Sequence, residues 1–313
     1  MALASSPRAP LRRRAFPTPA RTDPETMANL IAKEVASLLV GEENALAAVG
    51  VSFAGPVDAE KGRVVGSPNL PLFQDVPFRE MMAQRLGVPV VLENDARAAT
   101  LAEHRLGAGQ GTRHMVYVTV STGIGGGIVC GGRLYRGALG AAGEVGHMVL
   151  QADGPLCGCG KHGCWEAFSS GTAIARDAQE RLKAGDSSLL REMAPNGFQG
   201  ITARLVAEAA RQGDRLASEV LDRAAFYLGI GLVNLVNIFN PQVIVVGGGL
   251  TFVGDLLLGP AFRIARERAL QLPGSVVEFH VTALGDDGPL RGVLLLARRQ
   301  PAKTPSGASV EWA

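Results

Sequence analysis

Apolar residues recur along this chain in two rhythms, one with helical spacing and one with the short runs of buried strands. The first helix is expected after Asp23 and Pro24, an N-cap followed by a proline suited to the first helical position. Further helices are predicted at 76–86, from 95 to about 106, and at 169–184, 202–212, 214–239, after 249 and at 289–299. Strands are predicted at 47–53, 88–92, 115–120, 128–134, 243–246 and 276–284. Strands that alternate with helices indicate an α/β fold.

The order of these elements suggests two similar lobes with a hinge near the glycines of 107–109. We expect a small lobe formed by 23–108 plus 289–313, and a large lobe formed by 109–288. The segment 1–22 has five arginines, four prolines and no acid. Such a start is compatible with an organellar transit peptide, but its prolines oppose a continuous amphipathic helix. We therefore expect a solvated, disordered tail with a remnant strand, or a displaced start codon.

Composition narrows the class of protein. The 313 residues are 47% hydrophobic and 19% charged, which is typical of a globular chain rather than a disordered one. A net charge of +2 gives no reason to expect nucleic acid or a membrane surface as partner. No apolar run is long enough to span a membrane, so the expected compartment is the cytoplasm. The forty glycines cluster, which indicates binding loops that use the backbone.

The cysteines carry the strongest chemical signal. Cys157, Cys159 and Cys164 fall within eight residues, and His147 precedes them. Three thiolates and one imidazole form a complete tetrahedral set for Zn²⁺, and a complete set indicates a structural metal. His162 is a rival ligand, but its spacing to the neighbouring cysteines is too tight. Cys130 stands alone in an apolar run and is expected to be buried.

Acidic residues stand at three places that suit chemistry. Asp95 follows a short buried strand and opens a helix. It is either a helix N-cap or a general base that takes the proton from an attacking hydroxyl. Asn94 beside it is placed to orient a sugar hydroxyl. Glu144 and Glu166 bracket the cysteine loop, where they are either surface charges or acceptors for a polyol.

Two glycine-rich turns are candidates for backbone contacts to phosphate. The segment 121–127 follows an apolar strand, and the segment 247–249 lies between a strand and a helix. The first is not a P-loop, because no lysine follows it. It is not a dinucleotide fingerprint either, because a strand rather than a helix comes next.

Together these stretches resemble the ROK family of sugar kinases and sugar-responsive repressors. The matching segments read E-N-D-A at 93–96, T-G-I-G-G-G at 122–127, G-E-V-G-H-M at 143–148 and C-G-C-G-K-H-G-C-W-E at 157–166. The resemblance extends from about residue 17 to residue 299. It implies a two-lobed actin/hexokinase-like (ribonuclease H-like) fold with a zinc-binding loop, and ATP-dependent phosphorylation of a hexose, with glucose as the first choice. It also implies a homodimer or homotetramer.

The resemblance assigns roles to the candidate residues. Asp95 would be the catalytic base, and His147 would both bind zinc and face the sugar. The residues that would contact the sugar are Gly55, Asn69, Asn94, Glu144, His147 and Glu166. The residues that would contact ATP are Thr122, Gly123, Gly125 and Gly126 on the phosphate side and Gly248 and Gly249 on the adenosine side. Mg²⁺ would accompany the ATP.

One motif of the family is missing from this sequence. Family kinases begin with a strand, a turn and a strand that carry an Asp-x-Gly-Gly-Thr phosphate loop, and the 313 residues contain no such stretch. The expected small lobe is therefore truncated. Either the true start lies upstream, or the protein is a relative that binds sugar without efficient phosphoryl transfer. A zinc module for nucleic acid is disfavoured, because the cysteine spacing does not match the common fingers.

Overall fold

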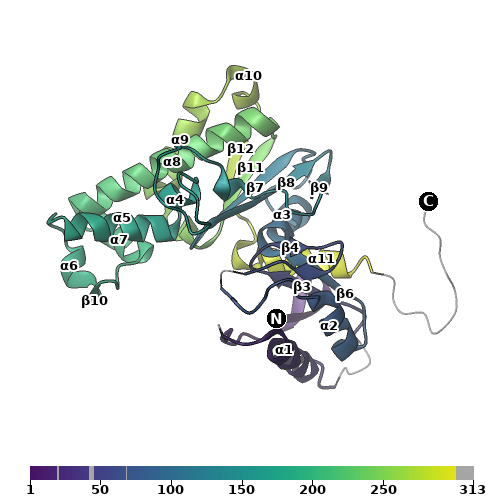
Figure 1. Ribbon diagram of the computed structural model, residues 1–313. Coiled ribbons are helices and arrows are strands. Elements are labelled where there is room, and N and C mark those ends of the chain that lie inside the picture. Colours follow the sequence, from purple (N-terminus) through teal and green to yellow (C-terminus); the bar gives the residue numbers. More distant parts are fainter. Residues whose placement is uncertain (20, 42–45, 68, 301–313) are drawn as a thin grey trace. The chain divides into compact units, whose positions relative to one another are not determined.

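The computed structural model describes residues 1–19, 21–41, 46–67 and 69–300 and shows a mixed α/β fold (Figure 1). The chain forms two compact units. Unit 1 comprises 1–106, 136–142 and the chain from 287 onward, and unit 2 comprises 107–135 and 143–286. The segment Arg136–Ala142 corrects the expected division, because it packs in unit 1 rather than in the large lobe. Residues 301–313, expected in the small lobe, lie outside the described residues.

Unit 1 is built from short strands and helices around an aromatic core. Its strands are β1 Ala2–Ser6, β2 Ala9–Arg13, β3 Val49–Phe53, β4 Val57–Asp58, β5 Arg63–Val64 and β6 Val90–Asn94. Its helices are α1 Pro24–Leu38, α2 Phe78–Leu86, α3 Asp95–Leu106 and α11 Gly288–Ala297. Strands β3 and β6 pair in parallel, whereas β1–β2 and β4–β5 are antiparallel hairpins. The rings of Phe53, Phe73 and Phe78 lie 5.4–6.2 Å apart at the centre of this core.

Two glycines let α11 approach its neighbours closely. A Cβ at Gly50 in β3 would overlap the backbone of Val293, and a Cβ at Gly292 would overlap the carbonyl of Ala98. The helix that ends the described chain therefore packs directly on the β3 strand and on α3, which begins at Asp95.

Within the segment 1–22, for which a disordered tail and a remnant strand are expected, residues 2–13 form the β1–β2 hairpin. The Met1 ammonium donates to the carbonyl of Arg14 at 2.8 Å, and the Arg14 amide donates to the carbonyl of Met1 at 3.1 Å. Arg12 donates to the carbonyls of Leu38 and Val40 at the end of α1, both at 2.9 Å. Arg12, which composition assigned to solvent, thus satisfies carbonyls that the end of a helix leaves without partners.

Unit 2 contains a mixed sheet with strand order β12-β11-β7-β8-β9. Its strands are β7 Met115–Val120, β8 Ile124–Cys130, β9 Arg133–Tyr135, β10 Pro195–Phe198, β11 Val243–Gly247 and β12 Glu278–Val281. Its helices are η1 Val145–His147, α4 Glu166–Ser169, α5 Gly171–Lys183, α6 Leu190–Met193, α7 Ala203–Arg211, α8 Arg215–Phe239, η2 Gly249–Leu256, α9 Leu258–Arg268 and α10 Gln271–Gly274, and η3 Gly285–Asp287 leads out. Every residue of β11 is buried.

The register of this sheet places the two glycine turns side by side. β11 pairs with β7 in parallel, with Gly247 opposite Thr119, so both strands end at the same edge. β8 starts at Ile124, earlier than the predicted strand 128–134, so part of the expected turn is strand. Cys130 ends β8 at a tight turn and is exposed, which corrects the expectation that it is buried.

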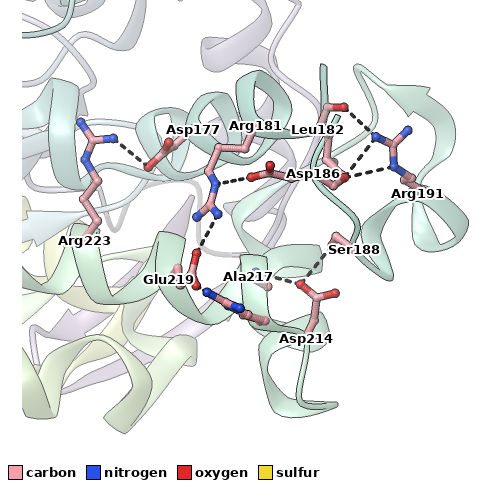
Figure 2. A network of polar contacts seen from close by, with 11 residues as sticks. Asp177, Arg181, Leu182, Asp186, Ser188, Arg191, Asp214, Ala217, Glu219 and Arg223 are labelled. Atoms are coloured by element: carbon pink, nitrogen blue, oxygen red, sulfur yellow. Dashed lines mark hydrogen bonds and ion pairs between the residues drawn. The ribbon is translucent and has the colours of Figure 1, made fainter. Parts of the chain in front are cut away.

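Ion pairs and caps join the helices that cover unit 2 (Figure 2). Arg181 of α5 donates to Asp186 at 2.9 Å and to Glu219 of α8 at 2.7 Å. Asp214 caps α8 by accepting from the Ala217 amide at 2.8 Å. Figure 1 shows α9 beside α8, where a Cβ at Gly229 would lie 2.7 Å from Ile264 Cβ.

Among the described residues, none of the helices is long and apolar enough to cross a membrane.

Candidate active site and metal centre

Asp95 lies at the junction of β6 and α3 in unit 1. Its Oδ1 accepts hydrogen bonds from the Asn94 side-chain amide and the Ala96 backbone amide, both at 2.9 Å. Burial raises the pKa of the Asp95 carboxyl above its ordinary value, although these hydrogen bonds act in the opposite direction. A partly buried carboxylate with a raised pKa is suited to accept a proton near neutral pH.

Asn94, rather than Asp95, caps α3. Its Oδ1 accepts from the Arg97 amide at 3.1 Å, and its Nδ2 also donates to the carbonyl of Gly55 at 3.1 Å. Asp95 is thus held by the residue before it and is not consumed as the helix cap. The N-cap role that the sequence offered for Asp95 thus belongs to Asn94.

Gly55 and Asn69 belong to the same neighbourhood of unit 1. Gly55 has φ +146, and a Cβ there would lie 2.7 Å from the carbonyl of Gly66, so this position favours glycine. Buried Ser67 connects the two loops, because its hydroxyl donates to the Ala54 carbonyl at 3.1 Å and accepts from the Asn69 amide at 3.3 Å. Asn69 itself is exposed.

Glu93, two residues before Asp95, belongs to a buried ion cluster that the sequence analysis missed. Glu93 is fully buried and accepts from Arg97 Nε at 2.8 Å and from Arg136 Nη2 at 2.6 Å. Its Oε1 also accepts from the Asn94 amide at 3.0 Å. Arg97, itself buried, donates onward to the Val57 carbonyl at 3.0 Å. The pair at i and i+4 was visible in the sequence, but its burial and the Arg136 contact were not.

The four predicted metal ligands converge in unit 2. The donor atoms of His147, Cys157, Cys159 and Cys164 all lie within 4.8 Å of one another. Cys159 Sγ lies 3.7 Å from Cys164 Sγ, and Cys157 Sγ lies 3.8 Å from His147 Nδ1. Tetrahedral Zn–S bonds of about 2.3 Å place ligand atoms roughly 3.8 Å apart, so the donor set fits zinc. His162 lies outside this set and points its Nδ1 to the Gly154 carbonyl at 3.0 Å.

Burial disfavours the thiolate form of Cys157 when no metal is bound. It raises the pKa of the Cys157 thiol to about 12. The pKa of Cys159 is lowered, chiefly because its thiolate accepts from the Lys161 amide. A bound divalent cation deprotonates a coordinating thiol, so the cluster has the chemistry of a metal site.

Glu166 connects the cysteine loop to the first glycine turn. One carboxylate oxygen accepts from the Ile124 amide at 2.8 Å, and the other lies 3.4 Å from Cys157 Sγ. A Cβ at Gly123 would overlap the first oxygen, so a larger residue here would displace the Glu166 carboxylate or the turn. Glu144, by contrast, is exposed where η1 begins.

The second glycine turn packs on the first. Gly248 has φ +91, and a Cβ there would lie 2.6 Å from Thr119 Oγ1 and from the Val120 carbonyl. A Cβ at Gly249 would lie 3.1 Å from Ser121 Oγ. In open α/β sheets, ligands bind at the carboxyl ends of parallel strands, and both turns occupy that position. Gly125 and Gly126 lie at the start of β8, opposite Thr119 and Val118 of β7, directly after the first turn.

The sequence and the fold match known proteins over nearly the whole chain. Residues 1–300 match the ROK family. A glucokinase of Streptomyces coelicolor is 38% identical over 288 residues, which are 90% of this chain and 88% of that protein. A xylose repressor of Caldicellulosiruptor bescii is 32% identical over 248 residues, 79% of this chain and 61% of the repressor. A crystal structure of a ROK family glucokinase from Streptomyces griseus, in complex with glucose and AMPPNP, matches with a TM-score of 0.80 at 34% identity, covering 96% of this chain and 95% of that one.

The fold expected from the resemblance is confirmed, because the α/β architecture is that of ROK sugar kinases. Catalytic and regulatory relatives share it, so family membership alone leaves the exact activity open. By its sequence and its fold, this chain belongs to the ROK family.

Proposed function

We propose that this chain is a sugar kinase that transfers the γ-phosphoryl group of ATP to a hexose, with glucose and its 6-hydroxyl as the preferred acceptor. The observation that carries the proposal is Asp95, a carboxylate with a raised pKa held by two hydrogen bonds at the end of β6. Similarity to glucokinases supports the choice of sugar.

Asp95 is the general base of the proposed reaction. As the sugar oxygen bonds to the γ-phosphorus, the bond from phosphorus to the ADP oxygen breaks, and the hydroxyl proton passes to the Asp95 carboxylate. Asn94, whose amide donates to Asp95 Oδ1, holds the base in place and contributes to the sugar site together with Gly55 and Asn69.

Unit 2 supplies the remaining groups. Thr122 and Gly123 receive the phosphates through turn amides, and Gly248 and Gly249 receive the adenosine side. Gly125 and Gly126 contribute as small strand residues beneath the turn. Mg²⁺ accompanies ATP and neutralises charge that develops on the phosphates. The sugar contacts from this unit are Glu144, His147 and Glu166.

Zinc is the proposed occupant of the His147, Cys157, Cys159 and Cys164 cluster. Four protein ligands leave no position for substrate, so the ion acts by shaping the loop. In this proposal His147 binds the ion through Nδ1 and presents the rest of its exposed ring to the sugar.

The test is a coupled assay of ADP formation with glucose, ATP and Mg²⁺. Asp95→Asn keeps the size of the side chain and the Oδ1 acceptor but removes the base, and it should lose turnover while retaining zinc. Asp222→Asn, on the exposed face of α8, is the matched control and should behave as the parent. Full activity in Asp95→Asn would remove Asp95 from the mechanism.

The second candidate is a sugar-binding relative without efficient phosphoryl transfer. The observation that favours it is the similarity to a xylose repressor, because ROK proteins include regulators. Calorimetry with glucose and with xylose, run beside the assay, distinguishes the two. Sugar binding without ADP formation would favour this candidate.

A further inference from the structure

A cavity within unit 2 lies between the cysteine loop, residues 155–167, and the helices α5 and α8. It has a volume of about 360 Å³, and its lining includes Pro155, Leu156, Ala167, Phe168, Arg176 and Arg223. All of these residues belong to unit 2. Because side chains leave this space open, the contacts that cross it have a large share in holding the loop against α5.

Arg176 of α5 crosses this space and contacts both ends of the loop. Its Nη1 donates to the Leu156 carbonyl at 3.2 Å, and its Nη2 donates to the Ala167 carbonyl at 2.5 Å. Its Nε lies 3.9 Å from the Glu180 carboxylate, four residues later in α5. A planar guanidinium carries its donors in a fixed fork, so it can hold two acceptors in one orientation. We call the two hydrogen bonds to the loop the clamp.

The Leu156 carbonyl is directed away from the opposite arm of the loop. Leu156 and His162 form an isolated antiparallel bridge between the two arms. The hydrogen bonds on either side of this bridge are donated by the amides of Cys157 and Gly163, at 2.8 and 2.9 Å. Leu156 is therefore at a non-hydrogen-bonded position of the ladder, where its carbonyl faces outward. In that direction it accepts from Arg176.

The Ala167 carbonyl belongs to the short helix α4, and the last carbonyls of a helix have no partner within it. The amide four residues later, that of Gly171, donates to the Ser121 carbonyl at 2.7 Å instead. Ala167 is buried, and a buried carbonyl without a partner is costly. Arg176 supplies the donor that this carbonyl needs.

The three thiols lie between the two contacts of the clamp. Leu156 directly precedes Cys157, and Ala167 follows Cys164 by three positions. A clamp on both ends restricts the space that the intervening thiols can sample, so it keeps them near one another before a metal binds. Preorganised ligands bind more tightly, because less of the binding free energy is spent on ordering them.

We propose that Arg176 is a positioning residue for the metal centre: the clamp holds both ends of the cysteine loop against α5 and so preorganises Cys157, Cys159 and Cys164 for zinc. This inference rests on the zinc of the proposed function, and no step of phosphoryl transfer enters it. Arg176 is not a ligand and acts through the backbone that carries the ligands, as outer partners in metal sites do.

The experiment compares Arg176→Gln with Arg223→Gln in the full chain. Arg223 is the matched control, because it lines the same cavity but pairs with Asp177 at 3.6 Å rather than with the loop (Figure 2). Glutamine keeps a polar side chain but removes the charge and the fork. Arg176→Lys tests rescue, because lysine restores a charged donor without the planar guanidinium.

Zinc transfer to a chromophoric pyridylazo chelator measures the metal site without any activity. Relative to Arg223→Gln, we expect Arg176→Gln to lose affinity for zinc about 10–100-fold, the usual effect of removing an outer partner. Arg176→Lys should recover part of that loss. Equal zinc affinity in Arg176→Gln and Arg223→Gln would overturn the proposal.

Thermal unfolding with and without zinc separates positioning of the metal ligands from a structural role alone. Zinc stabilises the native state in proportion to the logarithm of its affinity, so weaker binding costs stability only when zinc is present. The fall in Tm caused by Arg176→Gln should therefore be larger in the zinc-loaded chain than in the metal-free chain. An equal fall in both would reduce Arg176 to a structural residue and overturn its role toward the metal.

Hydrogen exchange of the metal-free chain judges the clamp independently of zinc. The amides of Cys157 and Gly163, which close the loop, should exchange about tenfold faster in Arg176→Gln than in Arg223→Gln. Equal exchange would overturn the clamp. If the parent chain takes up no zinc, the zinc assignment of the proposed function fails, and faster exchange in Arg176→Gln still supports the clamp.

Discussion

The Glu166 carboxylate accepts a hydrogen bond from the Ile124 amide at 2.8 Å, so the cysteine loop and the first glycine turn share one side chain. Its other oxygen lies 3.4 Å from Cys157 Sγ. A residue that sequence similarity assigns to sugar thus also fixes the backbone proposed to receive phosphate. The shape of that turn depends on a residue 42 positions later in the chain.

Gly123→Ala should impair nucleotide use more than sugar binding. The new Cβ would overlap Glu166 Oε2, so either the carboxylate or the turn must shift. We expect the KM for ATP to rise about tenfold or more, the effect of a misplaced binding group. Steady-state kinetics with ATP varied at saturating glucose will measure it.

The double variant Gly123→Ala/Glu166→Ala separates overlap from a general effect of alanine. Removing the carboxylate frees the space, so the KM for ATP should be no higher in the double variant than in Glu166→Ala alone. If the effect on the KM for ATP in the double variant equals the sum of the effects in the two single variants, the two residues act independently.

Asp95→Asn should lower kcat by about 10²–10⁴-fold and raise stability at neutral pH. Burial raises the folded-state pKa of Asp95 above its unfolded value, so the ionised carboxylate costs stability above the folded-state pKa. That cost vanishes as the pH falls below the unfolded value of about 3.9. The stabilisation by Asn, measured by urea unfolding, should therefore be largest near pH 8 and shrink as the pH is lowered. A variant less stable than the parent at pH 8 would contradict this reasoning.

Removal of the metal should destabilise the fold. The purified chain should contain about one zinc per molecule. A chelator should lower Tm by at least about 5 °C, because the free energy of metal binding contributes to the stability of the folded state. His147→Ala should lose the metal, as measured by elemental analysis. His162→Ala should keep it, because His162 contacts the Gly154 carbonyl and lies outside the four-ligand set. Metal loss in both variants would mean that the ligand set is misassigned.

Gly231→Ala should weaken the packing beneath the metal loop. A Cβ there would overlap the indole of Trp165, which is fully buried between Cys164 and Glu166. Overpacking of this kind costs about 1–3 kcal/mol, and it should also change the fluorescence of Trp165. Gly259→Ala is the control, since its Cβ would meet Asp255 at an ordinary 3.7 Å and alanine favours the helix. Equal stability of the two variants would contradict the predicted clash.

Where local sequence carried the signal, prediction succeeded. Asp23 caps α1 as expected, because its side chain accepts from the Thr26 amide three residues on. α8 runs from Arg215 to Phe239, close to the predicted 214–239, because Asp214 caps its start and Asn240 with φ +44 ends it. The four metal ligands converge as predicted, because three of them sit on one short glycine-rich loop.

Other features were decided by residues far apart in the chain, and local spacing does not record those contacts. The arginines of 1–22 looked solvated, yet Arg12 satisfies carbonyls at the end of α1. Arg136 looked like part of the large lobe, yet it pairs with Glu93, 43 positions earlier. The sequence by itself determined which chemical groups are present and which stand close along the chain. Only the tertiary structure decided which of them are buried together, because burial makes charge pairing obligatory and the chain must fold before any group is buried.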